Sequence, residues 1–271
     1  MDTNPRQIFL NSDHADKYFI INETGGTDSS TCLFNFTEPI IAPPGYDISL
    51  GVISFMIPCS WNRINVYNNT LVLKTTAQPS GVSISIPIGS YNITTLKNTL
   101  NSLLSSHGIV VTYVTETNRY TFTAGSGTFT FDSASTCLRL LGFTVNESHT
   151  STGLVLKSNS VIDLSGIANL YISTSLQTHN YDSRIKKMSN ILAIVPVNQQ
   201  SNGILQYTDH QPIRNIVNPT TISQIHVFIT DENGNLINLR NARWSGIMLV
   251  NFVPKVLVTI ENKIVDQSIT E

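Results

Sequence analysis

The chain has 271 residues and a mass of 29.9 kDa, enough for one large domain or two small ones. Its 16 Lys and Arg against 18 Asp and Glu give a formal net charge of −2, which argues against direct nucleic-acid binding because that function usually needs a basic excess. No stretch of about 18 apolar residues is present, and no apolar run follows the first charges. The sequence therefore predicts neither a membrane-spanning helix nor a signal peptide.

Short alternations of apolar and polar residues open the chain, and this pattern indicates β-strands. The longest alternation carries Ile48, Leu50, Val52 and Ile53, which suit a half-buried sheet. The strands predicted in this part are Gln7 to Leu10, Lys17 to Asn22, Thr31 to Phe36, Tyr46 to Ile57 and Thr70 to Thr75.

The middle of the chain changes to helical spacing. The segment Ser90-Tyr91-Asn92 offers a suitable N-cap, and apolar residues follow it at helical intervals through Leu104, until His107-Gly108 ends the helix. A second short helix is predicted from Ser133 to Leu141, stopped by Gly142. Between the two helices, strands are predicted at Ile109 to Val114, Arg119 to Thr123 and Thr128 to Phe131. Residues 79–150 are thus expected to form an α+β insertion subdomain.

Strand patterns return after residue 150, and Asn233-Gly234 is the strongest short hairpin signal among them. The predicted strands are Leu154 to Leu156, Asn169 to Thr174, Ile191 to Val197, Ile204 to Tyr207, Ile222 to Thr230 and Trp244 to Phe252. About ten to twelve strands, separated by Gly, Pro and Asn, predict an all-β jelly-roll sandwich. Residues 1–78 and 151–271 would form this jelly roll, and the insertion would interrupt it.

Motifs for catalysis are missing from the sequence. There is no phosphate-binding loop, nucleophile elbow or paired-histidine zinc motif, so we expect no enzyme activity, no metal and no cofactor. Asp231, Asn233 and Asn235 have the spacing of a calcium loop, but Leu236 stands where that loop needs Gly. A hairpin turn explains these residues better. An enzyme with two opposed carboxylates is a weak alternative, because the acids lie mostly in turns.

Cysteine and histidine give little indication of a site. Cys32, Cys59 and Cys137 are odd in number and widely spaced, which favours a reducing compartment over a disulfide framework. His14 is flanked by aspartates that could ligate a cation, but a solvated loop is the preferred interpretation. The segment Asn180 to Lys187 concentrates three cations and could contact an acidic partner, an exposed loop being the alternative.

Several short motifs occur in an order that resembles a known family. They are Ile48 to Pro58, Trp61 to Asn65, Asn68 to Thr70, Ile88 to Tyr91, Leu140 to Phe143 and Asp231 to Gly234, with Leu239 and Trp244 downstream. This order resembles capsid proteins of eukaryotic double-stranded DNA viruses in the adenovirus, virophage and Polinton-like lineage. In length the chain is more similar to their penton or minor capsid proteins than to the longer major capsid protein.

The resemblance implies an upright jelly roll in an icosahedral shell, with homopentamers at the fivefold vertices and the insertion projecting outward. It implies a virion protein made in the host cytoplasm, whose partners are further copies of itself and the neighbouring major capsid protein. Trimers of a hexon-like or minor subunit are an alternative. A second alternative is a host receptor or glycan bound through aromatic residues of the insertion, namely Tyr91, Tyr113, Tyr120 and Phe122.

Charged residues make up only 13% of the chain, about half the usual share, and depleted charge suits surfaces that are buried in large assemblies. We therefore expect apolar residues in predicted loops to lie between subunits, with a core position as the alternative for each. These interface candidates are Ile40, Ile41, Phe55, Met56, Trp61, Ile213, Ile216, Val217 and Phe252. The polar start through Arg6 and the tail Lys255 to Glu271 could tie the capsomer to its neighbours, with fraying in solution as the alternative.

Overall fold

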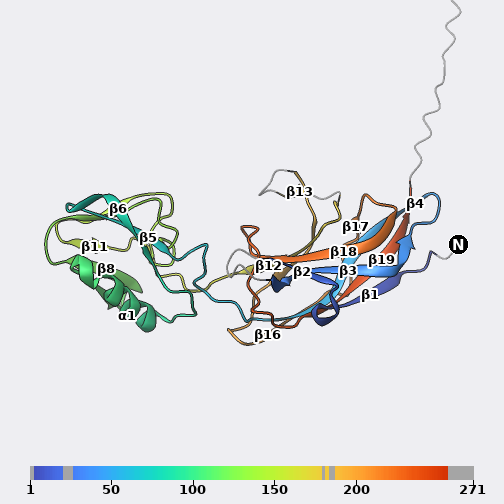
Figure 1. Cartoon of the computed structure of the whole chain (residues 1–271), viewed down its shortest axis with the longest axis horizontal. Coiled ribbons are helices and arrows are strands. Elements are labelled where there is room, and N and C mark those ends of the chain that lie inside the picture. Colours follow the sequence, from blue (N-terminus) through green and yellow to red (C-terminus); the bar gives the residue numbers. More distant parts are fainter. Residues whose placement is uncertain (1–2, 21–26, 179–180, 183–186, 256–271) are drawn as a thin grey trace, which may run out of the picture.

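Two lobes of unequal size make up this protein, whose computed structural model describes residues 3–20, 27–178, 181–182 and 187–255 (Figure 1). The larger lobe is a sandwich of two antiparallel sheets, and the smaller lobe is inserted between two of its strands. Two stretches of chain connect the lobes in Figure 1.

The first sheet of the sandwich, sheet A, has the order β1-β19-β4-β16, and the short strand β17 also pairs with β4. All of its pairings are antiparallel. Its strands are β1 (Arg6–Asn11), β19 (Ser245–Pro254), β4 (Tyr46–Pro58), β16 (Ile204–Thr208) and β17 (Asn215–Ile216).

The second sheet, sheet B, has the order β15-β12-β18-β3-β2 and is antiparallel throughout. The chain moves between sheets A and B as it proceeds from β1 to β19, which is the connectivity of a jelly roll. The predicted jelly-roll fold is confirmed, with five strands in each sheet. The strands of sheet B are β15 (Ile191–Pro196), β12 (Asn169–Thr174), β18 (Thr221–Thr230), β3 (Thr27–Ile41) and β2 (Lys17–Ile20).

Trp244 joins the two sheets at the centre of the jelly-roll core. Its ring stacks on Phe55 of sheet A with centroids 5.2 Å apart, and it meets Phe34 of sheet B edge-on at 6.1 Å. The indole Nε1 donates a 2.6 Å hydrogen bond to the carbonyl of Ser29 in β3. Gly246 leaves room for this stack, because a Cβ there would lie 2.8 Å from the Phe55 ring. One aromatic cluster therefore joins the two sheets, and the indole N–H of its tryptophan has a hydrogen-bond partner.

The smaller lobe contains two sheets and a helix. One sheet has the order β10-β9-β5-β6 and the other β11-β8-β7. Their strands are β5 (Thr70–Thr75), β6 (Gln78–Ser85), β7 (Ile109–Val114), β8 (Arg119–Ala124), β9 (Phe129–Phe131), β10 (His149–Thr150) and β11 (Val155–Lys157). The remaining elements of the chain are a short hairpin and two 3₁₀ turns, namely β13 (Tyr181–Asp182), β14 (Lys187–Met188), η1 (Ser12–His14) and η2 (Ser105–His107).

The helix α1 (Ile93–Leu104) confirms the helix predicted after Asn92. The Asn92 side chain accepts from the Thr95 N–H at 2.9 Å, and the Thr95 hydroxyl accepts from the Asn92 N–H at 3.0 Å, which completes a capping box. Its leucines at helical spacing face the core of the smaller lobe. No helix within the described ranges has the length and apolar character needed to cross a membrane.

The second predicted helix, Ser133 to Leu141, is wrong, because these residues form a series of turns. Polar groups of this turn form hydrogen bonds with the backbone of β5. The Ser135 hydroxyl accepts from the Val72 N–H at 2.8 Å, and the Thr136 N–H donates to the Thr70 carbonyl at 2.9 Å. A helix would turn these groups away from the sheet. The apolar residues of this segment are spaced as in a helix, but they are buried as parts of turns and not as one face of a helix.

Gly142 ends this turn with φ +79°, and a Cβ there would lie 2.5 Å from the Ser160 carbonyl oxygen. We expect Gly142→Ala to destabilise the smaller lobe by at least about 2 kcal/mol, since left-handed strain and a backbone clash add. Gly108→Ala is the matched control, because Gly108 has φ +66° but nothing within 4 Å. Thermal unfolding should show a clearly larger loss for Gly142→Ala, and equal losses would contradict this explanation.

The limits of the insertion are wider than residues 79–150. Its core begins at Ile64 and extends to Leu156, and it shares no residue with the jelly-roll core. β5, which the sequence assigned to the jelly roll, pairs with β6 and β9, and β11 pairs with β8. An alternating strand has the same pattern in either lobe, so its sheet could not be read from its own residues.

Candidate functional site

Five of the nine predicted interface residues belong to the jelly-roll core. Phe55 illustrates the reason: it alternates inward along β4 and lies under Trp244, out of reach of any neighbour. These five take the core position that the sequence analysis gave as the alternative, and they are Ile40, Phe55, Trp61, Val217 and Phe252. Three of them lie in β3, β4 and β19 rather than in loops.

The other candidates reach the surface. Ile41, Met56 and Ile213 are exposed, and Ile216 is half-buried. Their role between subunits stays a prediction. Ile213 is the most accessible of them, with 72% of its surface exposed.

Phe9 is an equally exposed apolar residue that the sequence analysis did not include among the interface candidates. It is also 72% exposed, while its neighbours Ile8 and Leu10 point into the core. The signal was present in the alternation of Gln7 to Leu10, where two inward aliphatic residues leave the aromatic residue between them facing outward.

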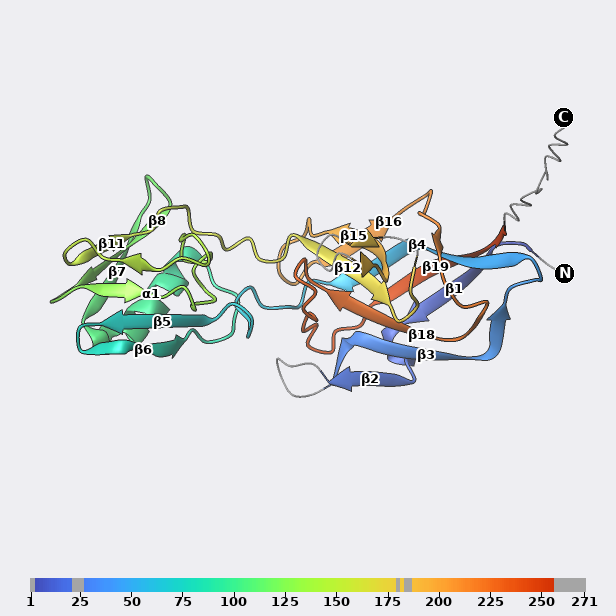
Figure 2. The same ribbon diagram turned by 90° about the horizontal axis from the view of Figure 1, so that it is seen from above.

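The two most exposed apolar residues, Phe9 and Ile213, lie on opposite long sides of the sandwich. One side, the β1/β2 flank, is formed by the edge strands β1 and β2 and carries Phe9. The other side, the β15/β16 flank, is formed by β15, β16 and β17 and carries Ile194 and Ile213. Figure 2 shows β15 and β16 on one side of the sandwich and β2 on the other.

A groove of about 350 Å³ opens on the β15/β16 flank between the edges of the two sheets. We call it the flank groove, and it is lined by residues that include Val52, Leu192, Ile194, Tyr207, Ile213 and Asn215. Asp209 is the charged residue of this lining. Burial, and then the nearby Asp209 carboxylate, raise the pKa of Tyr207, so its hydroxyl remains a neutral donor.

Asn215 holds the floor of the flank groove together. Its buried side-chain amide donates to the carbonyls of Leu50 at 3.1 Å, Leu192 at 3.3 Å and Ile213 at 3.2 Å. Leu50 belongs to sheet A and Leu192 to sheet B, so one side chain connects the two sheets at their open edge. The groove is thus a fixed feature of the fold rather than a loose gap.

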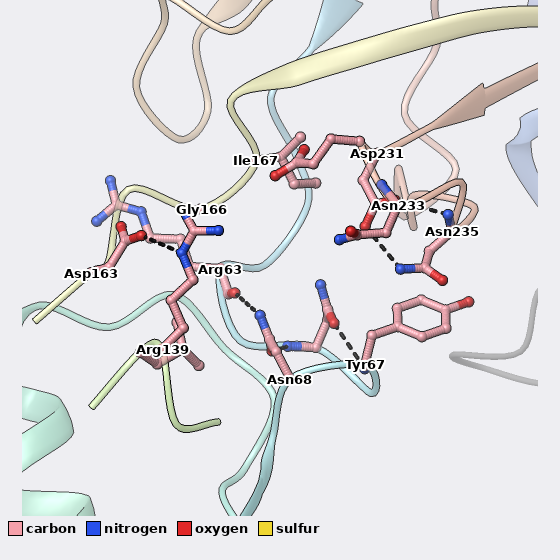
Figure 3. A pocket seen from close by; sticks show the side chains of 13 residues that line it. Arg63, Tyr67, Asn68, Arg139, Asp163, Gly166, Ile167, Asp231, Asn233 and Asn235 are labelled. Carbon is pink, nitrogen blue, oxygen red and sulfur yellow. Dashed lines mark hydrogen bonds and ion pairs between the residues drawn. The ribbon is translucent and has the colours of Figure 1, made fainter. Parts of the chain in front are cut away.

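A second hollow, of about 390 Å³, lies where the two lobes meet (Figure 3). Arg63, Arg139 and Asp163 lie on one side of it in Figure 3, and the loop from Asp231 to Asn235 lies on the other. Its lining is mostly polar and comes from both connecting stretches, from the turn at Arg139 in the insertion and from the β18–β19 loop.

Two carboxylates of this hollow, Asp163 and Asp231, are engaged in contacts within the protein. Arg139 Nε lies 2.9 Å from Asp163 Oδ2, and Asp231 Oδ1 accepts from the N–H groups of Asn233 and Asn235 at 2.8 Å each. Burial acts to raise the pKa of Asp163, but hydrogen bonds from Ser165 and Arg139 leave that pKa below its usual range. The predicted turn at Asp231 is confirmed, because its carboxylate holds the backbone N–H groups of the residues that follow it.

The three cysteines are free thiols, and all are buried. Burial raises the pKa of Cys32 and Cys137 to about 12 and also raises the pKa of Cys59. Within the described ranges, no three His, Cys, Asp or Glu side chains converge as metal ligands.

We expect the native protein to react with no more than a trace of Ellman's reagent at about pH 8, and all three thiols to react after denaturation. The raised pKa values also make the stability of the fold depend on pH. Stability is fully kept below the ordinary thiol pKa of 9.0 and is lost as the pH rises towards about 12, because the unfolded chain then ionises more readily than the folded one. Rapid native labelling of one thiol per chain would contradict the buried assignment, and the denatured sample is the control for reagent and count.

The aromatic residues considered for glycan binding do not form an exposed cluster. Tyr120 and Phe122 are fully buried in the core of the insertion, and Tyr91 and Tyr113 are half-buried against it. The Tyr120 hydroxyl donates to the Ile93 carbonyl at 2.7 Å, and burial raises its pKa. These rings stabilise the lobe, so they do not supply the exposed aromatic cluster that the glycan-binding alternative needs.

The remaining sequence features are accounted for as follows. His14 is exposed in η1, and the aspartates beside it are engaged elsewhere: Asp13 pairs with Arg243 at 2.9 Å, and Asp16 accepts from the Asn35 N–H at 2.6 Å. Arg6 begins β1 and lies 5.7 Å from the Phe252 ring centroid. Much of the basic segment 180–187 and the tail 256–271 lie outside the described residues.

No protein family and no curated protein matches the sequence. Among solved structures, the chain is similar to the crystal structure of the mavirus penton protein, with a TM-score of 0.43 and 12% sequence identity. This similarity covers 92% of this chain and 100% of the mavirus chain. A penton-like protein is therefore among the proteins that this chain resembles.

Proposed function

We propose that this chain is a structural virion protein that assembles with copies of itself into a capsomer, most favourably a pentamer at icosahedral fivefold vertices. The observation that carries the proposal is the placement of exposed apolar residues on opposite flanks of one jelly roll, with Phe9 on the first and Ile213 on the second. A closed ring requires two different contact surfaces on each subunit, and opposite flanks provide them.

The low content of charged residues supports the same proposal. Protein interfaces are depleted in charge at their centres, and a chain with 13% charged residues can bury much of its side surface without leaving ions unpaired. A stable contact needs about 800 Å² from each partner. Each subunit of a ring makes two such contacts, so neither contact has to be strong by itself.

The insertion has a separate role in this proposal. Its core is independent of the jelly-roll core, so it can project from the shell without taking part in the ring. The proposed partners are further copies of the chain, the neighbouring major capsid protein and, through the insertion, a host receptor. A trimeric minor subunit is the alternative within the same class.

The test is the mass of the purified protein by size exclusion with light scattering, followed by negative-stain images. Five copies of the 29.9 kDa chain give about 150 kDa, and fivefold rings at that mass would support the penton role. A trimer would move the assignment to a minor or hexon-like capsomer. A monomer at every concentration would overturn self-assembly as an intrinsic property.

A further inference from the structure

We propose that Phe9 of one copy inserts into the flank groove of the next copy, so that the β1/β2 flank of each chain meets the β15/β16 flank of its neighbour. This inference rests on the proposed self-assembly and names the contact that would drive it. The occupant of the groove is thus a second copy of this chain, and its anchor is one aromatic side chain.

The first part of the contact is the Phe9 side chain, which is held in a fixed position on the surface. β1 pairs with β19 along its whole length, from Arg6 opposite Val250 to Asn11 opposite Ser245. Ile8 and Leu10 are buried on the inner face, so the strand cannot rotate to hide Phe9. A large aromatic residue held outward in this way has the character of an interface anchor, because little side-chain freedom is lost when it is buried.

The second part is the flank groove. Its volume of about 350 Å³ lies within the range of sites that enclose small apolar groups, and Leu192, Ile194 and Ile213 offer aliphatic surface to a ring. The bridging amide of Asn215 fixes its floor. Ile213 at its rim is as exposed as Phe9, so docking would bury the two most exposed large apolar side chains of the described chain together.

Both flanks carry charges of both signs. The groove lining carries the Asp209 carboxylate, and exposed Arg214 lies between its lining residues Ile213 and Asn215. On the opposite flank Asp13 is paired with Arg243, while Asp16 and Lys17 are exposed, with Lys17 Nζ 4.9 Å from the Phe19 ring centroid. Lys17 can therefore face Asp209, and Asp16 can face Arg214, when the two flanks meet.

The positions of the two parts specify the symmetry of the contact. β1 is the first strand of sheet A and β16 is the last, so Phe9 and the groove cannot meet within one chain. A contact between unlike surfaces repeats from copy to copy, and it closes into a ring when the rotation permits. A twofold dimer would instead place like surfaces against each other.

Cross-linking of cysteine variants in the full chain tests the contact. Chains with Phe9→Cys are mixed with chains with Ile213→Cys and treated with a short bis-maleimide, and the native cysteines stay silent because they are buried. We expect strong cross-linking in the mixture and little with either variant alone. Gln7→Cys replaces Phe9→Cys in the control, because Gln7 is exposed on the same face of β1, and it should cross-link weakly.

Assembly of single variants provides the second measurement. We expect Phe9→Ser to raise the concentration needed for assembly by about ten-fold or more, while Gln7→Ser leaves it nearly unchanged. The melting temperature should stay near that of the natural chain, because both side chains are exposed. This separates a loss of contact from a loss of folding.

The outcomes distinguish this contact from the proposed function as a whole. If the natural chain forms oligomers but Phe9→Ser assembles normally and the mixed variants do not cross-link, the Phe9 contact is overturned and self-assembly stands. Strong cross-linking of Phe9→Cys with itself would also overturn it in favour of a twofold contact. If the natural chain is a monomer throughout, both proposals fail.

Discussion

Replacing Trp244 with Ala is expected to lower the free energy of unfolding of the jelly roll by about 3–5 kcal/mol. The substitution removes the stack on Phe55 and the edge contact with Phe34, and it leaves the Ser29 carbonyl without its indole donor. These contacts come from both sheets, so the cavity opens between them and cannot be closed by either sheet alone. Equilibrium unfolding in urea, followed by far-ultraviolet circular dichroism, measures the loss.

Two controls make this prediction specific. Trp244→Phe keeps most of the packing but loses the Nε1 donor, so it should cost about 1–3 kcal/mol and lie between the natural chain and the Ala variant. Hydrogen exchange should show lost protection in the strands of sheets A and B but unchanged protection in β5, β8 and α1, because the two cores share no residue. Equal loss of protection in both lobes would contradict the separation of the cores.

Local signals in the sequence predicted local structure well. The apolar pattern from Tyr46 to Ile57 predicted β4 almost to the residue, because Ile48, Leu50 and Val52 alternate along the strand and all face the core. Asn92 gave the start of α1, because a capping box is formed by residues only three positions apart. Both signals depend on neighbours in sequence, which are visible without a structure.

Features that depend on distant segments were not predictable in the same way. The sheet that β5 joins is decided by β9, which lies more than 50 residues later, and nothing within Thr70–Thr75 specifies that partner. The turn at Ser135 has helical apolar spacing, but its polar groups are needed by the backbone of β5. In both cases tertiary hydrogen bonds overrode the local pattern.

The candidate interface also contains one feature that the local sequence could predict and one that it could not. Phe9 could have been found from alternation alone, because β1 is an edge strand with one clear inward face. The flank groove could not, because it joins Val52, Leu192 and Ile213 from three parts of the chain. The buried candidates were chosen as apolar residues in loops, but three of them lie in strands that face the core.

Asp28 is the residue whose importance was least visible in the sequence, where it stands among Thr, Ser and Cys as if in a polar loop. It lies buried in β3, and its Oδ1 accepts from the N–H groups of Ser30 at 2.9 Å and Leu239 at 3.0 Å. Its Oδ2 accepts from the Asn241 N–H at 2.9 Å. One carboxylate therefore anchors the loop that leads to Trp244.

Replacing Asp28 with Asn should cost about 2–4 kcal/mol, although the two side chains have nearly the same shape. An amide presents one acceptor oxygen, so its NH₂ group must face at least one of the three backbone N–H groups, and that buried donor loses its partner. Urea unfolding measures the cost. Asp16→Asn is the control, because its exposed carboxylate accepts one backbone hydrogen bond from Asn35 and water can replace it.

The consequence of this substitution extends to the surface. Loosening the loop at Leu239 and Asn241 also frees Arg243, which is paired with Asp13 on the β1/β2 flank. Asp28→Asn should therefore weaken self-assembly as well as folding, whereas Asp16→Asn should change neither by more than about 1 kcal/mol. If Asp28→Asn were as stable as the natural chain, the carboxylate would not be the anchor of this loop, and the ordering of Trp244 would have to come from packing alone.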